Sequence, residues 1–176
     1  MRKKFVMAVA AVAMAAVMSV SACADDGVTV ASITGNDGTT FVTPSSASAS
    51  EETKKAYEAI ATTEGTTEEK LAAALVSTSA EGSAEQAAAI LNDAASVVGA
   101  ETVADVTIRT VGDVIVSENN TATLSVAGVE DGEAVVVVYL DENGNWQTMK
   151  VIAQNGRLVF HLSKSTTVMV LAKKAA

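Results

Sequence analysis

Apolar residues between positions 51 and 99 recur three and four positions apart, which is the spacing of amphipathic helices. Each of three segments opens with a hydroxyl residue that is followed three positions later by an acceptor side chain, as in a capping box. These pairs are Ser48 with Glu51, Thr66 with Glu69, and Ser83 with Gln86. We expect three short helices: one to about Thr62, one over Thr67 to Val76, and one over Ala84 to Val98 that ends at Gly99, a natural left-handed cap.

After Gly99 the apolar period changes from 3.6 to 2, which is typical of strands. Residues 106–110 and 121–126 alternate apolar and polar positions, so each predicts a strand with one face in water, and a break is expected at Gly112-Asp113. Ala134 to Leu140 is continuously apolar, which predicts a strand covered on both faces. Two Asn-Gly pairs, at 143–144 and 155–156, predict hairpin turns. Further strands are expected at 146–152, 157–162 and 167–172.

These elements predict an α+β fold in which about three short N-terminal helices precede an antiparallel β-sandwich or open barrel of about six to seven strands. Residues 24–50 are rich in Ser, Thr, Gly and Ala, so we interpret them as a flexible tether, although Val28, Val30 and Ile33 also suit a short strand. Whether the helices and the strands share one core is left open by the pattern. The expected organisation is a signal peptide (1–23), a tether (24–50), a helical segment (51–99) and a β domain (102–174).

The N-terminal segment indicates export from the cytoplasm. Three basic residues, Arg2 to Lys4, precede an uncharged apolar run from Phe5 to Met18. This run has the length of a signal-peptide core and is shorter than the roughly 20 residues that a spanning helix needs. We therefore expect the mature protein to be extracytoplasmic.

Two processing sites fit this segment. Val20-Ser21-Ala22-Cys23 resembles a bacterial lipobox, in which the Cys becomes an acylated N-terminus. Ala22-Cys23-Ala24 also fits an ordinary small-x-small site, with Asp25 as the first mature residue. We favour the lipobox and take Cys23 as the candidate lipidation residue, so the membrane is a partner if Cys23 is acylated.

Charge narrows the range of partners. The 176-residue chain has 12 basic and 21 acidic residues, a net charge of -9. Three of the basic residues lie in the signal segment, so the processed chain has 9 basic against 21 acidic residues, a net charge of -12. An acidic protein repels phosphate backbones, so we expect no nucleic acid partner. Only 3% of the residues are aromatic, which makes an aromatic sugar platform difficult to assemble.

No motif supplies catalytic chemistry. His161 is the only histidine and alternates with Phe160 and Leu162, which suggests a surface position on a strand. Asp141, Asn143 and Asn145 alternate like calcium ligands, but Trp146 and Ile152 occupy the positions where a calcium loop requires Gly and Glu. We therefore predict no catalytic, cofactor or metal residues, interpret the acidic turn at 130–133 as surface charge, and expect Trp146 to pack in the core.

The segment from Thr121 to Lys173 resembles small all-β, Ig-like modules at the C-terminal end of secreted and cell-surface proteins of clostridial-type Gram-positive bacteria. The shared pattern consists of turn glycines and strand hydrophobes, and Ser163 to Thr166 departs from it where the family often has Ser-Pro. The resemblance implies an extracellular, non-catalytic module and supplies no active-site residues. The residues that carry it are Gly128-Val129, Gly132, Val135 to Tyr139, Gly144, Trp146, Gly156, Leu158, Phe160, Val168 and Val170.

The sequence therefore favours an exported, non-enzymatic bacterial cell-surface module with a binding or structural role. Its partner would be an extracellular or envelope protein or a glycan. Two alternatives stay open: a secreted hydrolase that uses carboxylates of the 130–133 or 141–145 loops, and an accessory subunit of an envelope assembly.

Overall fold

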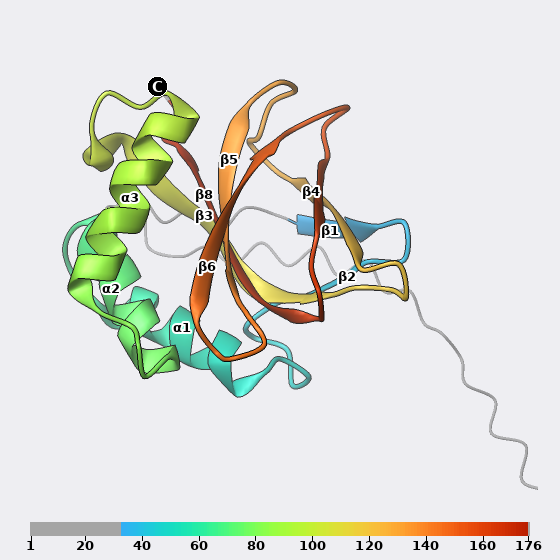
Figure 1. Ribbon diagram of the computed structural model, residues 1–176, viewed down its shortest axis with the longest axis horizontal. Helices are drawn as coiled ribbons and strands as arrows, with labels where there is room; N and C mark the ends of the chain where they lie inside the picture. Colours follow the sequence, from blue (N-terminus) through green and yellow to red (C-terminus); the bar gives the residue numbers. More distant parts are fainter. Residues whose placement is uncertain (1–32, 176) are drawn as a thin grey trace, which may run out of the picture.

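The computed structural model describes residues 33–175, so the signal segment and Cys23 lie outside the described residues. Within this range the chain forms an α+β fold of three helices and eight strands (Figure 1). Two short strands precede the helices, so the helices are not at the N-terminal end of the fold as the sequence predicted. In chain order the elements are β1 (Ile33–Asn36), β2 (Thr40–Val42), α1 (Glu51–Thr62), α2 (Thr67–Thr78), α3 (Ala84–Val98), β3 (Val106–Ile115), β4 (Thr121–Val126), β5 (Ala134–Leu140), β6 (Trp146–Ile152), β7 (Leu158–His161) and β8 (Thr166–Lys173).

The strands form two antiparallel sheets. One has three strands in the order β1-β4-β7, and the other has five in the order β2-β3-β8-β5-β6. The helices cover one face of the five-stranded sheet, and the three-stranded sheet packs against the other face (Figure 1). The chain passes from one sheet to the other at the β1–β2, β3–β4, β4–β5, β6–β7 and β7–β8 connections.

Two apolar cores result, and they share the five-stranded sheet. Val136 and Val138 of β5 face the helices, whereas Val135 and Val137 face the other sheet. This confirms the prediction that residues 134–140 are covered on both faces. Because the first core joins all three helices to β3, β5 and β8, the helical segment and the strands form one packed unit.

The sequence predicted that one face of residues 106–110 lies in water, and this prediction is wrong. β3 is buried on both faces from Val106 to Val114, because it is an interior strand of the sheet that both layers cover. The predicted break at Gly112-Asp113 is also absent. The Phe41 ring lies against Gly112, where an added Cβ would come 2.2 Å from the ring, so glycine here permits close packing. The irregularity is instead a register shift between Ile108 and Thr110.

Residues 33–50 differ from the expected tether. β1 pairs with β4 and β2 pairs with β3, so this segment adds a strand to each sheet. Thr39 is buried, and its Oγ1 accepts a hydrogen bond of 2.9 Å from the Thr123 amide. Ala49 is buried as well. This segment has little apolar surface of its own. It is ordered because its main chain forms hydrogen bonds with sheet edges that would otherwise be open. The remainder of the expected tether, residues 24–32, lies outside the described residues.

The helix caps confirm two of the three predicted pairs. Thr66 and Glu69 form a reciprocal capping box, and Ser83 Oγ accepts from the Gln86 amide. α3 ends as expected at Gly99, whose φ is 65°. The first pair is wrong: α1 is capped by Ser50, whose Oγ accepts from the Thr53 amide, and not by Ser48. Ser50 is favoured because it also contacts the sheet, as described below.

Candidate functional site

Two adjacent hollows lie at the end of the five-stranded sheet where the β5–β6 hairpin and the β7–β8 loop meet the helices. The first has a volume of about 400 Å³ and the second about 720 Å³. Gly144, at the tip of the β5–β6 hairpin, borders both. We call the two hollows together the polar groove, because most of its lining residues carry hydroxyl, amide or charged groups.

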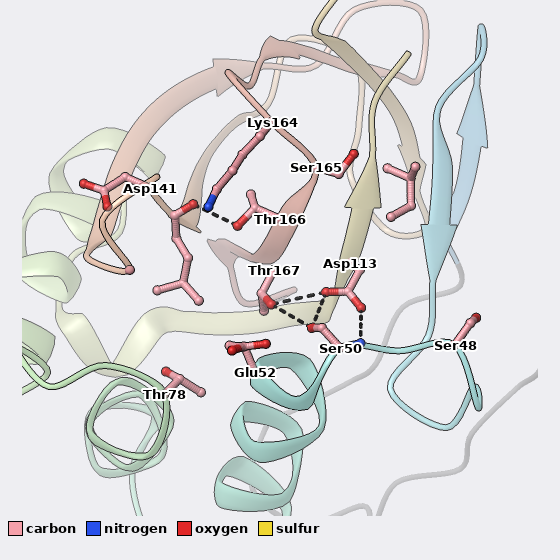
Figure 2. Close-up of a pocket in the computed structure, with 13 residues that line it drawn as sticks. Ser48, Ser50, Glu52, Thr78, Asp113, Asp141, Lys164, Ser165, Thr166 and Thr167 are labelled. Carbon is pink, nitrogen blue, oxygen red and sulfur yellow. Dashed lines mark hydrogen bonds between the residues drawn. The ribbon is translucent and has the colours of Figure 1, made fainter. Parts of the chain in front are cut away.

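A buried carboxylate, Asp113 of β3, forms the floor of the first hollow. Its Oδ2 accepts a hydrogen bond of 2.6 Å from the Ser50 amide. Its Oδ1 accepts from the hydroxyls of Ser50 and Thr167 at 2.7 and 3.2 Å (Figure 2). It also accepts from the Thr53 hydroxyl at 2.6 Å. Burial of a charge is costly unless hydrogen bonds compensate for it, and here four donors do so.

These contacts attach the first turn of α1 to the centre of the sheet. Ser50 is the N-cap residue of α1, so Asp113 bonds to the residue whose own Oγ caps the helix. A carboxylate at this position also interacts favourably with the positive end of the helix dipole. Since both oxygens of Asp113 already accept protein hydrogen bonds, we infer a structural role for this carboxylate.

Asp141 organises the hairpin on the opposite side of the first hollow. Its Oδ1 accepts from the amides of Asn143 and Asn145 at 2.8 and 2.9 Å, and its Oδ2 accepts from Gln147 Nε2 at 3.1 Å. The Asn145 amide is the main reason that the pKa of Asp141 lies below its ordinary value. The Asn143 amide, Gln147 and the nearby Lys164 charge also lower this pKa, while partial desolvation opposes them.

The remaining charged groups of the first hollow are available to a ligand. Figure 2 shows Glu52 and Thr78 reaching in from the helices, and Lys164 and Thr166 from the opposite side. Glu52 and Lys164 are exposed, and neither forms an ion pair within the described part of the chain. The hollow therefore offers a cation, a carboxylate and several hydroxyls on a fixed polar floor.

The second hollow is rich in side-chain amides, including those of Gln86, Asn145 and Gln147. Trp146 at its base is 3% exposed and belongs to the helix–sheet core, which confirms the prediction that it packs inside. Its Nε1 donates to Thr78 Oγ1 at 2.9 Å. Gln86 Nε2 donates to the Trp146 carbonyl at 3.4 Å, and the buried Gln86 Oε1 has no partner among residues 33–175.

The sequence-predicted residues are spread over the fold. His161 is exposed on β7 while Phe160 and Leu162 are buried, as the alternation predicted. The acidic turn at 130–133 lies at the opposite end of β5 from the 141–145 hairpin, so the structure does not bring these two carboxylate loops together. Glu133 Oε2 accepts from the Glu130 amide at 2.9 Å.

Sequence reasoning missed Asp113 as an organising residue and treated it as part of a break. A signal was present, because a single carboxylate inside a run of apolar strand residues must find donors if the strand is buried. Its partners Ser50, Thr53 and Thr167 lie more than 50 positions away along the chain. Such partners cannot be identified before the fold is known.

No three His, Cys, Asp or Glu side chains in residues 33–175 gather in a way that could hold a metal ion. None of the described helices has the length and hydrophobicity needed to cross a bilayer. No known protein family matches the chain, and neither the curated proteins nor the solved structures include a significant match.

Proposed function

We propose that the protein is an exported, non-enzymatic bacterial cell-surface module that binds a partner through the polar groove. The N-terminal pattern up to Ala24 supports export, and acylation of Cys23 would attach the module to a membrane. The two facing antiparallel sheets are compatible with the Ig-like sandwich that Thr121 to Lys173 resembles. This supports an extracellular adaptor or structural part.

The observation that carries the non-enzymatic assignment is the state of the two fixed carboxylates of the groove. Asp113 accepts four hydrogen bonds from the fold, and Asp141 accepts three within its own hairpin. A general base works best with a pKa near the working pH, whereas the pKa of Asp141 is lowered by its hydrogen bonds. The hydrogen bonds of these two residues position an α-helix and a turn instead, which favours a rigid binding surface.

The position of the N-terminal entry supports a groove directed away from the membrane. Ile33 begins β1 and pairs with Val126, at the end of the strands opposite the polar groove. Only residues 24–32 separate Cys23 from Ile33, and nine residues span at most about 30 Å. A lipid on Cys23 would therefore hold the opposite end of the fold close to the membrane and present the groove outward.

The Cys23→Ala variant tests the lipid attachment. Ala22 and Ala24 keep the small-x-small pattern, so the variant is still exported by the ordinary route. We expect native protein in the membrane fraction and the variant in the soluble extracytoplasmic fraction, with Ser21→Ala as a control that stays in the membrane. An unprocessed wild-type chain in the cytoplasm would contradict the proposal.

The competing hydrolase hypothesis is tested with a panel of cell-wall polymers and polysaccharides as substrates. We expect no turnover by the purified protein. Turnover that disappears in Asp141→Asn or in Glu133→Gln, while the variant keeps its fold, would establish an enzyme and overturn the non-enzymatic assignment.

A further inference from the structure

β6 forms one edge of the five-stranded sheet and pairs along its length with β5 alone. In an antiparallel ladder, residues alternate between bonding to the neighbouring strand and facing away from it. The Asp141 amide donates to Asn145 O, and the Ala153 amide donates to Glu133 O. Both bonds lie in the β5–β6 register, so residues 147, 149 and 151 bond to β5.

The alternate residues, Thr148 and Lys150, consequently direct their amides and carbonyls away from the sheet. Neither residue takes part in any turn, loop or side-chain hydrogen bond among residues 33–175. β6 meets β7 only through the bridge between Gln154 and Arg157 beyond its end. A short stretch of main chain therefore stays open at this edge.

The helical layer covers Trp146 at the start of β6 and leaves the strand uncovered beyond it. The side chains of Thr148, Lys150 and Ile152 are all exposed, and Ile152 is 48% accessible. In Figure 1, α3 lies beside the sheet and leaves β6 at the front of the molecule. The open edge is thus accessible from Thr148 to Ile152 and has an exposed apolar side chain at one end.

The second hollow lies at the other end of this edge. Trp146 is the preceding residue of β6 whose main-chain carbonyl is directed away from β5, although its side chain is buried. Gln86 Nε2 already donates a hydrogen bond to this carbonyl. This bond fixes the Gln86 amide so that its Oε1 is the unpartnered acceptor. Glu81, an exposed carboxylate, lines the same hollow.

We propose that the β6 edge and the second hollow together bind an extended peptide that adds to the five-stranded sheet as a sixth strand. Thr148 and Lys150 would exchange main-chain hydrogen bonds with the peptide, and a basic peptide residue would lie in the hollow near Glu81. This inference rests on the proposed function and names the class of its partner.

Two observations favour a basic peptide over other partners. The hollow is lined by amides and a carboxylate, and its one aromatic residue, Trp146, is buried, so it lacks the exposed aromatic surface typical of sugar sites. The chain carries a net charge of -9, which attracts cationic segments. Pairing with a second copy centred on Lys150 would place two lysines opposite each other, which disfavours that occupant.

The test uses random peptides displayed on phage as the probe, followed by synthesis of the selected peptides and calorimetric titration. Lys150→Pro removes an amide that faces away from the sheet, a position at which an edge strand tolerates proline. We expect this variant to keep its circular dichroism spectrum and to bind roughly tenfold more weakly or worse. Lys150→Gln keeps the amide and is the matched control, with affinity near that of the wild type.

Hydrogen exchange of the complex supplies an independent readout, since Thr148 and Lys150 amides should become protected when the peptide binds. Failure to select any peptide, equal binding by the proline variant, or peptides that protect another surface would overturn the proposal. Binding of glycan polymers at this edge in place of peptides would also overturn it. None of these results depends on where the protein is located, so failure here is distinguishable from failure of the proposed export.

Discussion

At the scale of single residues, Asp113 determines how α1 meets the sheet. It is 6% exposed and yet receives donors from the N-cap of α1, from the first turn of that helix and from β8. Its hydrogen bonds connect segments that are far apart in sequence. Loss of this carboxylate leaves several buried donors without an acceptor, and such groups are costly to bury.

We expect Asp113→Ala to lower the free energy of unfolding by about 3 kcal/mol. Urea denaturation, with the slope m unchanged, measures this loss. Asp131→Ala is the control, because Asp131 is exposed in a turn, and its effect should stay within about 0.5 kcal/mol. Equal effects of the two variants would contradict the anchoring role of Asp113.

The lowered pKa of Asp141 predicts how the stability of the fold changes in acid. Its folded-state pKa is lowered, chiefly by the Asn145 amide, so ionised Asp141 stabilises the fold above its unfolded pKa. This contribution is lost as the pH falls through the folded pKa. Carbon-13 NMR titration should give a carboxyl midpoint below the ordinary aspartate value, and Asp141→Asn should remove this part of the acid dependence. A midpoint at or above the ordinary value would contradict the hairpin geometry.

At the scale of elements, the N-cap residue of α1 differs between the sequence prediction, Ser48, and the structure, Ser50. Ser48 and Ser50 are both hydroxyl residues close to the helix start, but only Ser50 bonds to the Thr53 amide and to Asp113. We expect Ser50→Ala to cost about 1–2 kcal/mol of unfolding free energy, and Ser48→Ala less than about 0.5 kcal/mol. Thermal unfolding of both variants decides between the two caps.

The register of β6 predicts an alternating pattern of hydrogen exchange in the free protein. Amides of residues 147, 149 and 151 bond to β5 and should exchange slowly, while those of Thr148 and Lys150 should exchange quickly. Residue-resolved NMR exchange measures this. Slow exchange at Thr148 and Lys150 in the absence of peptide would show that the edge is already occupied.

Local patterns predicted the elements well where neighbours in sequence determine them. The apolar run of β5, the α3 boundaries with Gly99 and the Thr66–Glu69 box are examples. The pattern failed where a distant layer determines burial. Polar residues such as Thr107 and Arg109 are buried because the sheet is covered twice, and β1 and β2 form because sheet edges accept them. The polar groove could not be predicted, since its sides come from loops, helix ends and strand ends that are far apart in the sequence.

At the scale of the whole molecule, the two cores share one sheet, so the fold should unfold as one unit. Leu91 lies in the helix–sheet core and Leu124 in the inter-sheet core, and both are fully buried. We expect Leu91→Ala and Leu124→Ala each to cost about 2–5 kcal/mol. Trp146 fluorescence and circular dichroism should report a single shared transition in both variants. Two separate transitions would show independent domains.

The central claim, that this is an exported surface module, is tested most directly by the intact mass and cell fraction of the native protein from its own host. We predict a membrane-bound species that begins at an acylated Cys23. A soluble extracytoplasmic species beginning at Asp25 would support export but contradict the lipid anchor. A cytoplasmic chain that still begins at Met1 would contradict the claim.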